Sequence, residues 1–200
     1  MYTVNSIRNI CLLGHSGSGK TALAESLLYM TGAIDRIGKN ADGNTVCDYD
    51  PEEIRRHISI STSVVPLEYH NVKLNLLDTP GAFDFSGAVM EALRAADAAI
   101  LVCSAKDGIT VGFEKAWKYC EDRNMPRFVY ISKVDEDNSD YNATFNALRE
   151  KYGNKIAPVV IPIWNSAHKV TGIIDVLNKR AYEMQDQKRV EIEIPEGKDA

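Results

Sequence analysis

Apolar and polar positions alternate along the chain in blocks that predict strands and helices in turn. Apolar runs predict strands at residues 8–14, 57–69, 72–78, 98–105 and 127–133. Apolar residues at helical spacing predict helices at residues 20–32, 85–97, 111–124 and around 141–152. Strands that alternate with helices imply right-handed crossovers. The chain should therefore form a mostly parallel sheet covered on both faces, a three-layer α/β/α arrangement.

The pattern changes after Gly153. Strand-like runs at 156–164 and 189–195 flank the segment 172–184, whose apolar spacing predicts a helix. We interpret this region as the beginning of a smaller α+β subdomain. The sequence thus predicts two parts, residues 1–155 and residues 156–200.

Composition narrows the class of protein. The 200 residues are 44% hydrophobic and 26% charged, which is typical of a globular protein. A net charge of −5 without a long basic run argues against direct DNA binding. The apolar runs are too short for a signal peptide or a membrane span, so we expect a cytoplasmic protein with no membrane partner. The cysteines, which form no Cys-x-x-Cys pair, argue against a zinc site and for reduced thiols: Cys11, Cys47, Cys103 and Cys120.

The strongest functional signal is a phosphate-binding motif between the first predicted strand and the first predicted helix. The pattern G-x-x-x-x-G-K-[ST] is matched in full by Gly14, His15, Ser16, Gly17, Ser18, Gly19, Lys20 and Thr21. Its glycines let backbone N–H groups curl around phosphates, and the helix adds the positive end of its dipole. Lys20 would bridge the β- and γ-phosphates, and the Thr21 hydroxyl would bind Mg²⁺. The alternative is a Gly/Ser-rich turn with an incidental lysine.

A second motif ends the strand predicted at 72–78. Asp78 would hold Mg²⁺ through a water, and the Gly81 N–H could contact the γ-phosphate because no Cβ blocks its approach. The predicted nucleotide contacts here are Asp78, Thr79, Pro80 and Gly81. An Asp-Pro-Gly turn without function is the alternative.

A third motif follows the strand predicted at 127–133. Ser132-Lys133-Val134-Asp135 is close to the Asn-Lys-x-Asp signature of guanine recognition, with serine in place of asparagine. Asp135 can accept hydrogen bonds from the N1–H and the 2-amino group of guanine, which adenine cannot supply. The Lys133 stem would lie over the base plane. A solvated loop at the end of a strand is the alternative.

Four segments, in this order and spacing, now resemble one family. GHSGSGKT, DYDPEEIRRHISIST, LNLLDTPG and SKVD are similar to the GTPase domain of translation factors, above all elongation factor G and its paralogues. The segment VIPIWNSAHKVTGIIDVLNKRAYEM resembles the opening of the subdomain inserted into that domain. The resemblance implies a P-loop NTPase fold with GTP or GDP and Mg²⁺ as ligands. It also implies GTP hydrolysis to GDP and phosphate, stimulated by the ribosome and driving translocation.

Besides Ser132, the sequence departs from the family pattern at two further positions. Ser59 stands where the family has a threonine that closes over Mg²⁺, and it keeps the hydroxyl, so Thr21, Ser59 and Asp78 are the implied metal ligands. Ala82 stands where the family has the histidine that orients the attacking water, so no catalytic residue is assigned. His15 and His57 are nearby in the sequence, and one could substitute. If neither histidine takes this role, GTP hydrolysis should be orders of magnitude slower than in family members that have the histidine.

Two alternatives to a translocating GTPase remain open. One is a paralogue that binds GTP and the ribosome without hydrolysis, and the other is a P-loop small-molecule kinase. The family's final base-contacting loop, strand and helix come after the inserted subdomain. Because this sequence stops at Ala200, we expect a fragment of a longer protein.

A polar stretch, residues 33–56, lacks clear periodicity and should be the first switch, which becomes ordered when the γ-phosphate and Mg²⁺ are present. Charged side chains near its end are interpreted as a solvated surface: Glu52, Glu53, Arg55 and Arg56.

Overall fold

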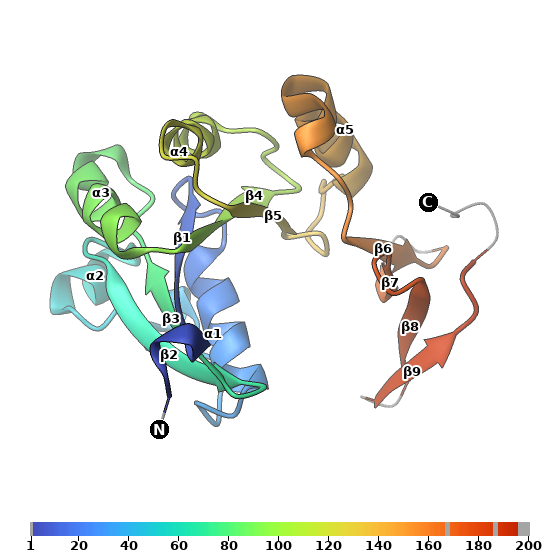
Figure 1. The fold of residues 1–200 in the computed structure, drawn as a ribbon, viewed down its shortest axis with the longest axis horizontal. Coiled ribbons are helices and arrows are strands. Elements are labelled where there is room, and N and C mark those ends of the chain that lie inside the picture. Colours follow the sequence, from blue (N-terminus) through green and yellow to red (C-terminus); the bar gives the residue numbers. More distant parts are fainter. Residues whose placement is uncertain (1, 167–168, 186–187, 196–200) are drawn as a thin grey trace. The chain divides into compact units, whose positions relative to one another are not determined.

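The computed structural model describes residues 2–166, 169–185 and 188–195. The chain divides into two compact units, Met1–Lys133 and Val134–Ala200, and each is described by itself (Figure 1). The division predicted from the sequence, after residue 155, stays a prediction. The final residue, Ala200, lies outside the described residues.

A five-stranded sheet forms the centre of the first unit, in the order β2-β3-β1-β4-β5. Its strands are β1 (Ile7–Gly14), β2 (Ser63–Tyr69), β3 (Val72–Asp78), β4 (Ala98–Ser104) and β5 (Arg127–Ser132). All neighbours are parallel except β2, which pairs antiparallel with β3 at one edge. The mostly parallel sheet predicted from the alternation of elements is thus confirmed.

The β2–β3 turn has positive φ at both His70 and Asn71, the conformation that a tight two-residue hairpin requires. The strand predicted at 57–69 is wrong in its first part, because residues 57–62 form no strand. Two backbone N–H groups of this part instead meet a buried carboxylate, as described for the site below.

Helices cover both faces of this sheet (Figure 1). The helices are α1 (Lys20–Met30), α2 (Pro51–Arg56), α3 (Ser86–Ala95) and α4 (Val111–Asp122), with 3₁₀ turns η1 (Val4–Ser6), η2 (Asn40–Asp42) and η3 (Phe83–Phe85). Successive side chains of a strand point to opposite faces. Leu12 accordingly packs against α1 on one face of the sheet. Leu13 points to the opposite face, where it lines a pocket with Val89 of α3 and Ala116 of α4. The three-layer arrangement follows.

The second unit contains α5 (Tyr141–Tyr152), the turn η4 (Gly153–Lys155) and an antiparallel sheet in the order β6-β7-β8-β9. Its strands are β6 (Val160–Trp164), β7 (Val170–Asp175), β8 (Arg180–Gln185) and β9 (Lys188–Ile192).

The helix predicted at 172–184 is wrong, because this segment forms β7, a turn and β8. Ile174 and Ala181 pair across the two strands and bury their side chains together with Ile163. The turn is fixed by Asp175, whose carboxylate accepts hydrogen bonds from the backbone and the side chain of Asn178. Burial of one face of a hairpin therefore outweighs the helical spacing of the apolar residues.

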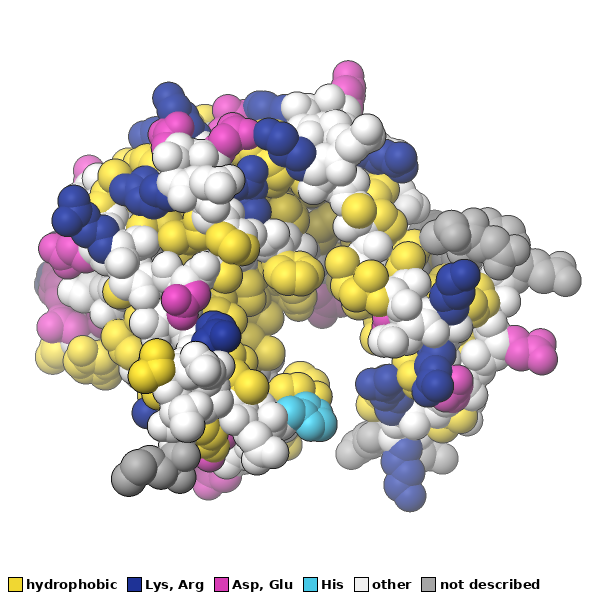
Figure 2. All heavy atoms as spheres, viewed as in Figure 1, with side chains coloured by type: hydrophobic (Ala, Val, Ile, Leu, Met, Phe, Trp, Pro, Cys, Tyr) yellow, Lys and Arg dark blue, Asp and Glu magenta, His cyan; other side chains and the backbone are white. Residues whose placement is uncertain are grey.

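No helix in the described ranges is long and apolar enough to cross a membrane. On the face shown in Figure 2, lysine and arginine side chains are scattered among acidic ones.

Candidate functional site

The phosphate-binding motif forms a tight loop between β1 and α1. Gly17 and Gly19 have φ of 73° and 98°, a conformation that favours glycine, and Gly19 is the N-cap residue directly before α1. At Gly14, a Cβ would lie 2.5 Å from the Val102 carbonyl oxygen. The loop can therefore curl tightly against β4 only with glycine at this position. Ser16 is exposed, and the Ser18 hydroxyl is buried with no hydrogen-bond partner among the described residues.

The ammonium group of Lys20 lies inside this loop. It donates hydrogen bonds to the carbonyl oxygens of Gly14 (3.2 Å) and His15 (3.0 Å). Burial lowers the pKa of Lys20 to about 8, against the opposing attraction of Asp78 and Asp48. An anion at the mouth of the loop would add to the compensating charge of these two carboxylates.

Three oxygen-bearing side chains meet beside Lys20. The Thr21 hydroxyl donates a 2.7 Å hydrogen bond to Oδ2 of Asp78, and it lies 3.4 Å from the Ser59 hydroxyl. Asp78 is 1% exposed, and burial raises its pKa to about 6 although Thr21 and Lys20 oppose the shift. Its Oδ1 is buried with no hydrogen-bond partner among the described residues.

This arrangement fits Mg²⁺. The cation prefers hard oxygen ligands, and it commonly binds proteins through one or two side chains while keeping several waters. A water on the metal would satisfy the unpaired Oδ1 of Asp78 and relieve the cost of burying its charge. The three ligands that the sequence predicts, Thr21, Ser59 and Asp78, are thus brought together.

Asp48 is a further carboxylate at this place that the sequence reasoning missed. It is buried, accepts a 2.6 Å hydrogen bond from Nδ2 of Asn40, and carries a charge that acts on both Lys20 and Asp78. Burial raises its pKa, and the facing hydroxyl of Ser59 partly offsets the shift. In the sequence, Asp48 lies in a polar stretch without periodicity, and such a stretch gives no signal that one of its residues is buried.

The Asp78–Gly81 segment closes the other side of the loop. A Cβ at Gly81 would come 2.5 Å from the Ser16 nitrogen and 2.6 Å from Nζ of Lys20, so the backbone approaches the phosphate loop as closely as glycine allows. The Thr79 hydroxyl donates to the Leu12 carbonyl at 2.6 Å, and Pro80 is buried. These two residues therefore fix the segment to β1.

Ala82 lines a small pocket that continues from this segment towards α3 and α4, together with Gly81, Phe83 and Lys115. Of the two histidines considered as substitutes, His57 is exposed, and its Nδ1 lies 2.7 Å from the Asn40 carbonyl, to which it can only donate. The His15 ring lies between Phe83, with ring centres 5.9 Å apart, and the first turn of α4. A Cβ at Gly112 in that turn would come 2.7 Å from Nδ1 of His15.

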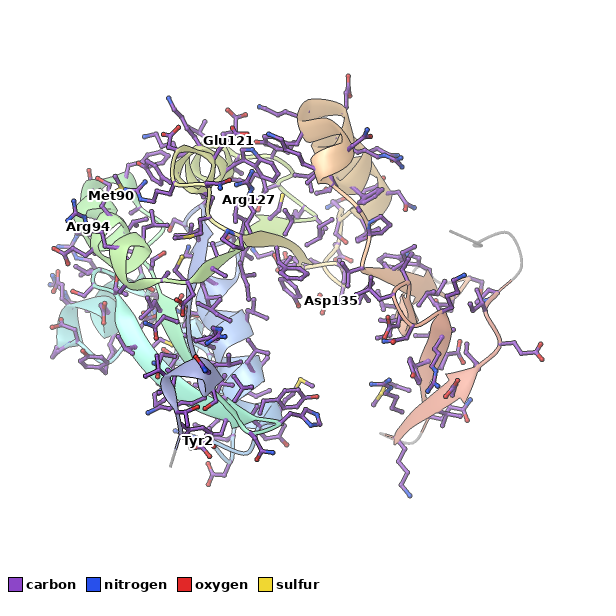
Figure 3. The ribbon with its side chains drawn as sticks, viewed as in Figure 1. Tyr2, Met90, Arg94, Glu121, Arg127 and Asp135 are labelled. Atoms are coloured by element: carbon purple, nitrogen blue, oxygen red, sulfur yellow. The ribbon has the colours of Figure 1, made fainter. Side chains whose placement is uncertain are left out.

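The residues predicted to read the base begin at the end of β5. The Ser132 hydroxyl contacts two backbone carbonyls, at 2.6 Å from Ser18 and 3.3 Å from Cys103, so it braces the phosphate loop. Lys133 has a positive φ of 56° directly after the strand. Asp135 lies exposed in the following turn, within the second unit (Figure 3).

The stretch predicted as the first switch is folded around two buried glutamates. Glu25 of α1 accepts hydrogen bonds from the backbone N–H of Gly38 (2.8 Å) and Val46 (2.6 Å). The interpretation of Glu53 as a solvated residue is wrong, because it is 2% exposed. Glu52 remains at the surface and forms ion pairs there with Arg55 and Arg56.

Comparisons with known proteins agree with this geometry. The family described as the elongation factor Tu GTP binding domain matches residues 5–191. An elongation factor G-like protein of Mycobacterium tuberculosis is 38% identical over 183 residues, which are 92% of this chain and 25% of that protein. The mitochondrial ribosome-releasing factor 2 of Debaryomyces hansenii is 33% identical over 177 residues, 86% of this chain and 21% of the other.

A crystal structure of a protein from Thermus thermophilus resembles this fold with a TM-score of 0.89 at 41% identity. The match covers 96% of this chain and 28% of the other. The chain spans about a quarter of the length of the curated relatives named here.

Proposed function

This chain belongs to the family of the elongation factor Tu GTP binding domain, and we propose that it is the nucleotide-binding part of an elongation factor G-type GTPase acting in translation. In this proposal the loop from Gly14 to Thr21 holds the phosphates of GTP or GDP, and Asp135 selects guanine. Thr21 and Ser59 bind Mg²⁺, with Asp78 behind a water. When bound, the metal neutralises charge on the β- and γ-phosphates.

The observation that carries the proposal is the meeting of Lys20, Thr21 and Asp78 at the phosphate loop. A buried ammonium group and a buried, half-satisfied carboxylate lie beside a hydroxyl within 2.7 Å of that carboxylate. This set leaves one cation and one unsatisfied oxygen next to a curl of glycines. In a nucleoside triphosphate bound with Mg²⁺, the phosphates complement the cation and a water on the metal complements the oxygen.

The partner that we propose for the whole protein is the ribosome, on which GTP binding and hydrolysis would drive translocation. Among the relatives, one is named for elongation and another for ribosome release. Since GTP and GDP differ by the γ-phosphate that Ser59 and Gly81 would contact, the bound nucleotide can shift the population of the switch.

A second candidate function is favoured by Ala82. Its methyl group has no atom that can orient a water, so the chain would bind GTP on the ribosome and release it unhydrolysed or after slow hydrolysis. The match to a GTP-binding family gives no support to the small-molecule kinase.

A single-turnover assay of the full-length protein with intact ribosomes and labelled GTP separates the two candidates. Phosphate release at about 1 s⁻¹ or faster, the ordinary range of enzymes, identifies a hydrolase. Release that stays orders of magnitude slower, and that rises about a hundredfold or more in Ala82→His, identifies the binder. Equal competition by ATP and GTP for the site would overturn both.

A further inference from the structure

Ser59 has a position in the site but no secondary structure to hold it. It lies between the end of α2 and the start of β2, in a segment that forms neither helix nor strand. Its hydroxyl nevertheless faces Thr21 at 3.4 Å. A short loop loses backbone freedom when it adopts one conformation, and this loss opposes its ordering. Some contact must therefore fix it.

The Ser59 hydroxyl faces the carboxylate of Asp48, and the backbone of the segment is held by Glu53. Its Oε1 accepts hydrogen bonds from the backbone N–H groups of Ile60 (2.9 Å) and Ser61 (3.0 Å), the two residues that follow Ser59. The backbone N–H of Ile58, on the other side, bonds to the Glu53 carbonyl oxygen at 3.3 Å. One residue thus holds the main chain before and after Ser59.

The second oxygen of Glu53 serves its own helix. Oε2 accepts from the Asp50 N–H at 3.2 Å, while the Asp50 side chain caps α2 by accepting from Glu52 at 2.8 Å. The carboxylate is therefore fixed at one end to the first turn of α2, and it is 2% exposed. Hydrogen bonds to a charged acceptor in such a place are stronger than those between neutral groups.

We propose that Glu53 is a positioning residue for the metal ligand Ser59. It sets the backbone on both sides of Ser59, so that the hydroxyl points at the Thr21–Asp78 pair rather than into solvent. Glu53 is not itself a proposed ligand of nucleotide or metal; it acts on Ser59 through the backbone of residues 58–61, and its charge also acts on Asp48. The inference rests on the proposed function for the role of Ser59 as a metal ligand. The hydrogen bonds from Ile60 and Ser61 to Glu53, called the tether below, do not depend on that function.

Hydrogen exchange of the full-length protein, with no nucleotide added, tests the tether. In Glu53→Ala, exchange at the amides of Ile60 and Ser61 should be about tenfold faster or more, since each loses a bond to a charged acceptor. Exchange at Gly38 and Val46 should not change. The matched variant Glu25→Ala should give the reverse pattern, because Glu25 holds those two amides. Equal exchange of Ile60 and Ser61 in wild type and Glu53→Ala would overturn the proposal.

The dependence of GTP binding on Mg²⁺ tests the role. The measured quantity is the Mg²⁺ concentration that half-saturates binding of a fluorescent, slowly hydrolysed GTP analogue. We expect a rise of about tenfold in Glu53→Ala and a similar rise in Ser59→Ala. Because Glu53 acts through Ser59, the double variant should rise no further than Ser59→Ala. Additive effects would overturn the proposal.

Two further variants separate positioning from a general loss of structure. Glu53→Gln keeps a carbonyl oxygen for Ile60 and Ser61 but turns its NH₂ group towards the Asp50 N–H, which is also a donor, so its half-saturating Mg²⁺ concentration should lie between those of wild type and Glu53→Ala. Asp50→Ala loosens the N-terminus of α2 without touching those amides, so its Mg²⁺ dependence should equal that of wild type. A large effect of Asp50→Ala would assign the phenotype to the helix and overturn the proposal. If the wild type binds no guanine nucleotide, the proposed function fails, and the exchange experiment still decides on the tether.

Discussion

The hydroxyl of Ser132 donates to the backbone carbonyl of Ser18 at 2.6 Å and so joins the end of β5 to the phosphate loop. The two residues are 114 positions apart in the chain, and both side chains are buried. A β5 residue predicted to read the base is therefore engaged with the loop that would hold the phosphates. Its hydroxyl has one proton to donate, and two carbonyls compete for it.

Ser132→Ala should accordingly weaken the binding of every nucleotide to a similar extent. Loss of one buried hydrogen bond corresponds to about 0.5–1.5 kcal/mol, or about two- to thirteenfold in affinity. The ratio of GTP to ATP affinity should stay as in the wild type. Fluorescence titration with labelled GTP and ATP measures both values. Asp135→Ala is the control, since it should collapse that ratio, and a collapse in Ser132→Ala instead would assign base reading to the serine.

The charged carboxylate of Asp78 should lower the stability of the folded protein, although the proposed Mg²⁺ binding requires it. Burial raises its pKa in the folded chain to about 6 from an ordinary 3.8. Between these values the folded state binds more protons than the unfolded state, so the stability that protonated Asp78 provides is lost as pH rises from about 4 to 6. By this reasoning, Asp78→Asn should stabilise the protein free of nucleotide and metal at pH 7, by up to about 3 kcal/mol.

Urea unfolding at pH 5 and pH 7, in the presence of a chelator, measures this effect. The gain of Asp78→Asn over wild type should be larger at pH 7, and the variant should lose the Mg²⁺ dependence of GTP binding. A variant less stable than wild type at pH 7 would mean that the buried charge is compensated in the folded state.

A side chain at position 81 should clash with the phosphate loop and weaken nucleotide binding. In Gly81→Ala the added Cβ meets the backbone nitrogen of Ser16, which cannot move aside as a side chain could. Overpacking of this kind costs about 1–3 kcal/mol, and we expect GTP affinity to fall about tenfold or more. Gly87→Ala is the matched control, because a Cβ there meets nothing within 4 Å and improves helix propensity. Calorimetric titration with GTP and thermal unfolding of both variants would show whether the two glycines differ as predicted.

The cysteine thiols should be inert in the native protein. All four are free and buried, and burial raises the pKa of Cys11 and Cys103 to about 12 and that of Cys120 to about 11. Since the thiolate is the reactive form, almost none is present at pH 8. A disulfide reagent that reports released thiolate should therefore detect no thiol until denaturant is added, and then four. Rapid reaction of one thiol in the native protein would contradict the burial described here.

The order of the motifs and the alternation of elements were enough to predict the central sheet and the tight glycine-rich loop between β1 and α1. These signals are local, because a glycine pattern between a strand and a helix determines its own geometry. The neighbourhood of Asp78 and Thr21 followed as well, since parallel strands deliver their carboxyl ends to one edge of the sheet.

What the sequence did not reveal depends on contacts between one element and the next, seven or eight residues further along the chain. Glu53 looks like a surface residue of a charged helix, but its carboxylate is buried and accepts hydrogen bonds from the backbone N–H groups of residues 60 and 61 as well as Asp50. In the segment 172–184, Ile174 pairs with Ala181, so the choice between helix and hairpin was settled by packing across strands. Propensity alone could not reveal either outcome.

Gly112 places the main chain of α4 directly against His15, with no side chain between them. A side chain between them could change rotamer and so accommodate a small shift of the helix. At Gly112, therefore, no side chain separates α4 from the His15 end of the loop, and a larger residue there would have to displace either the helix or His15.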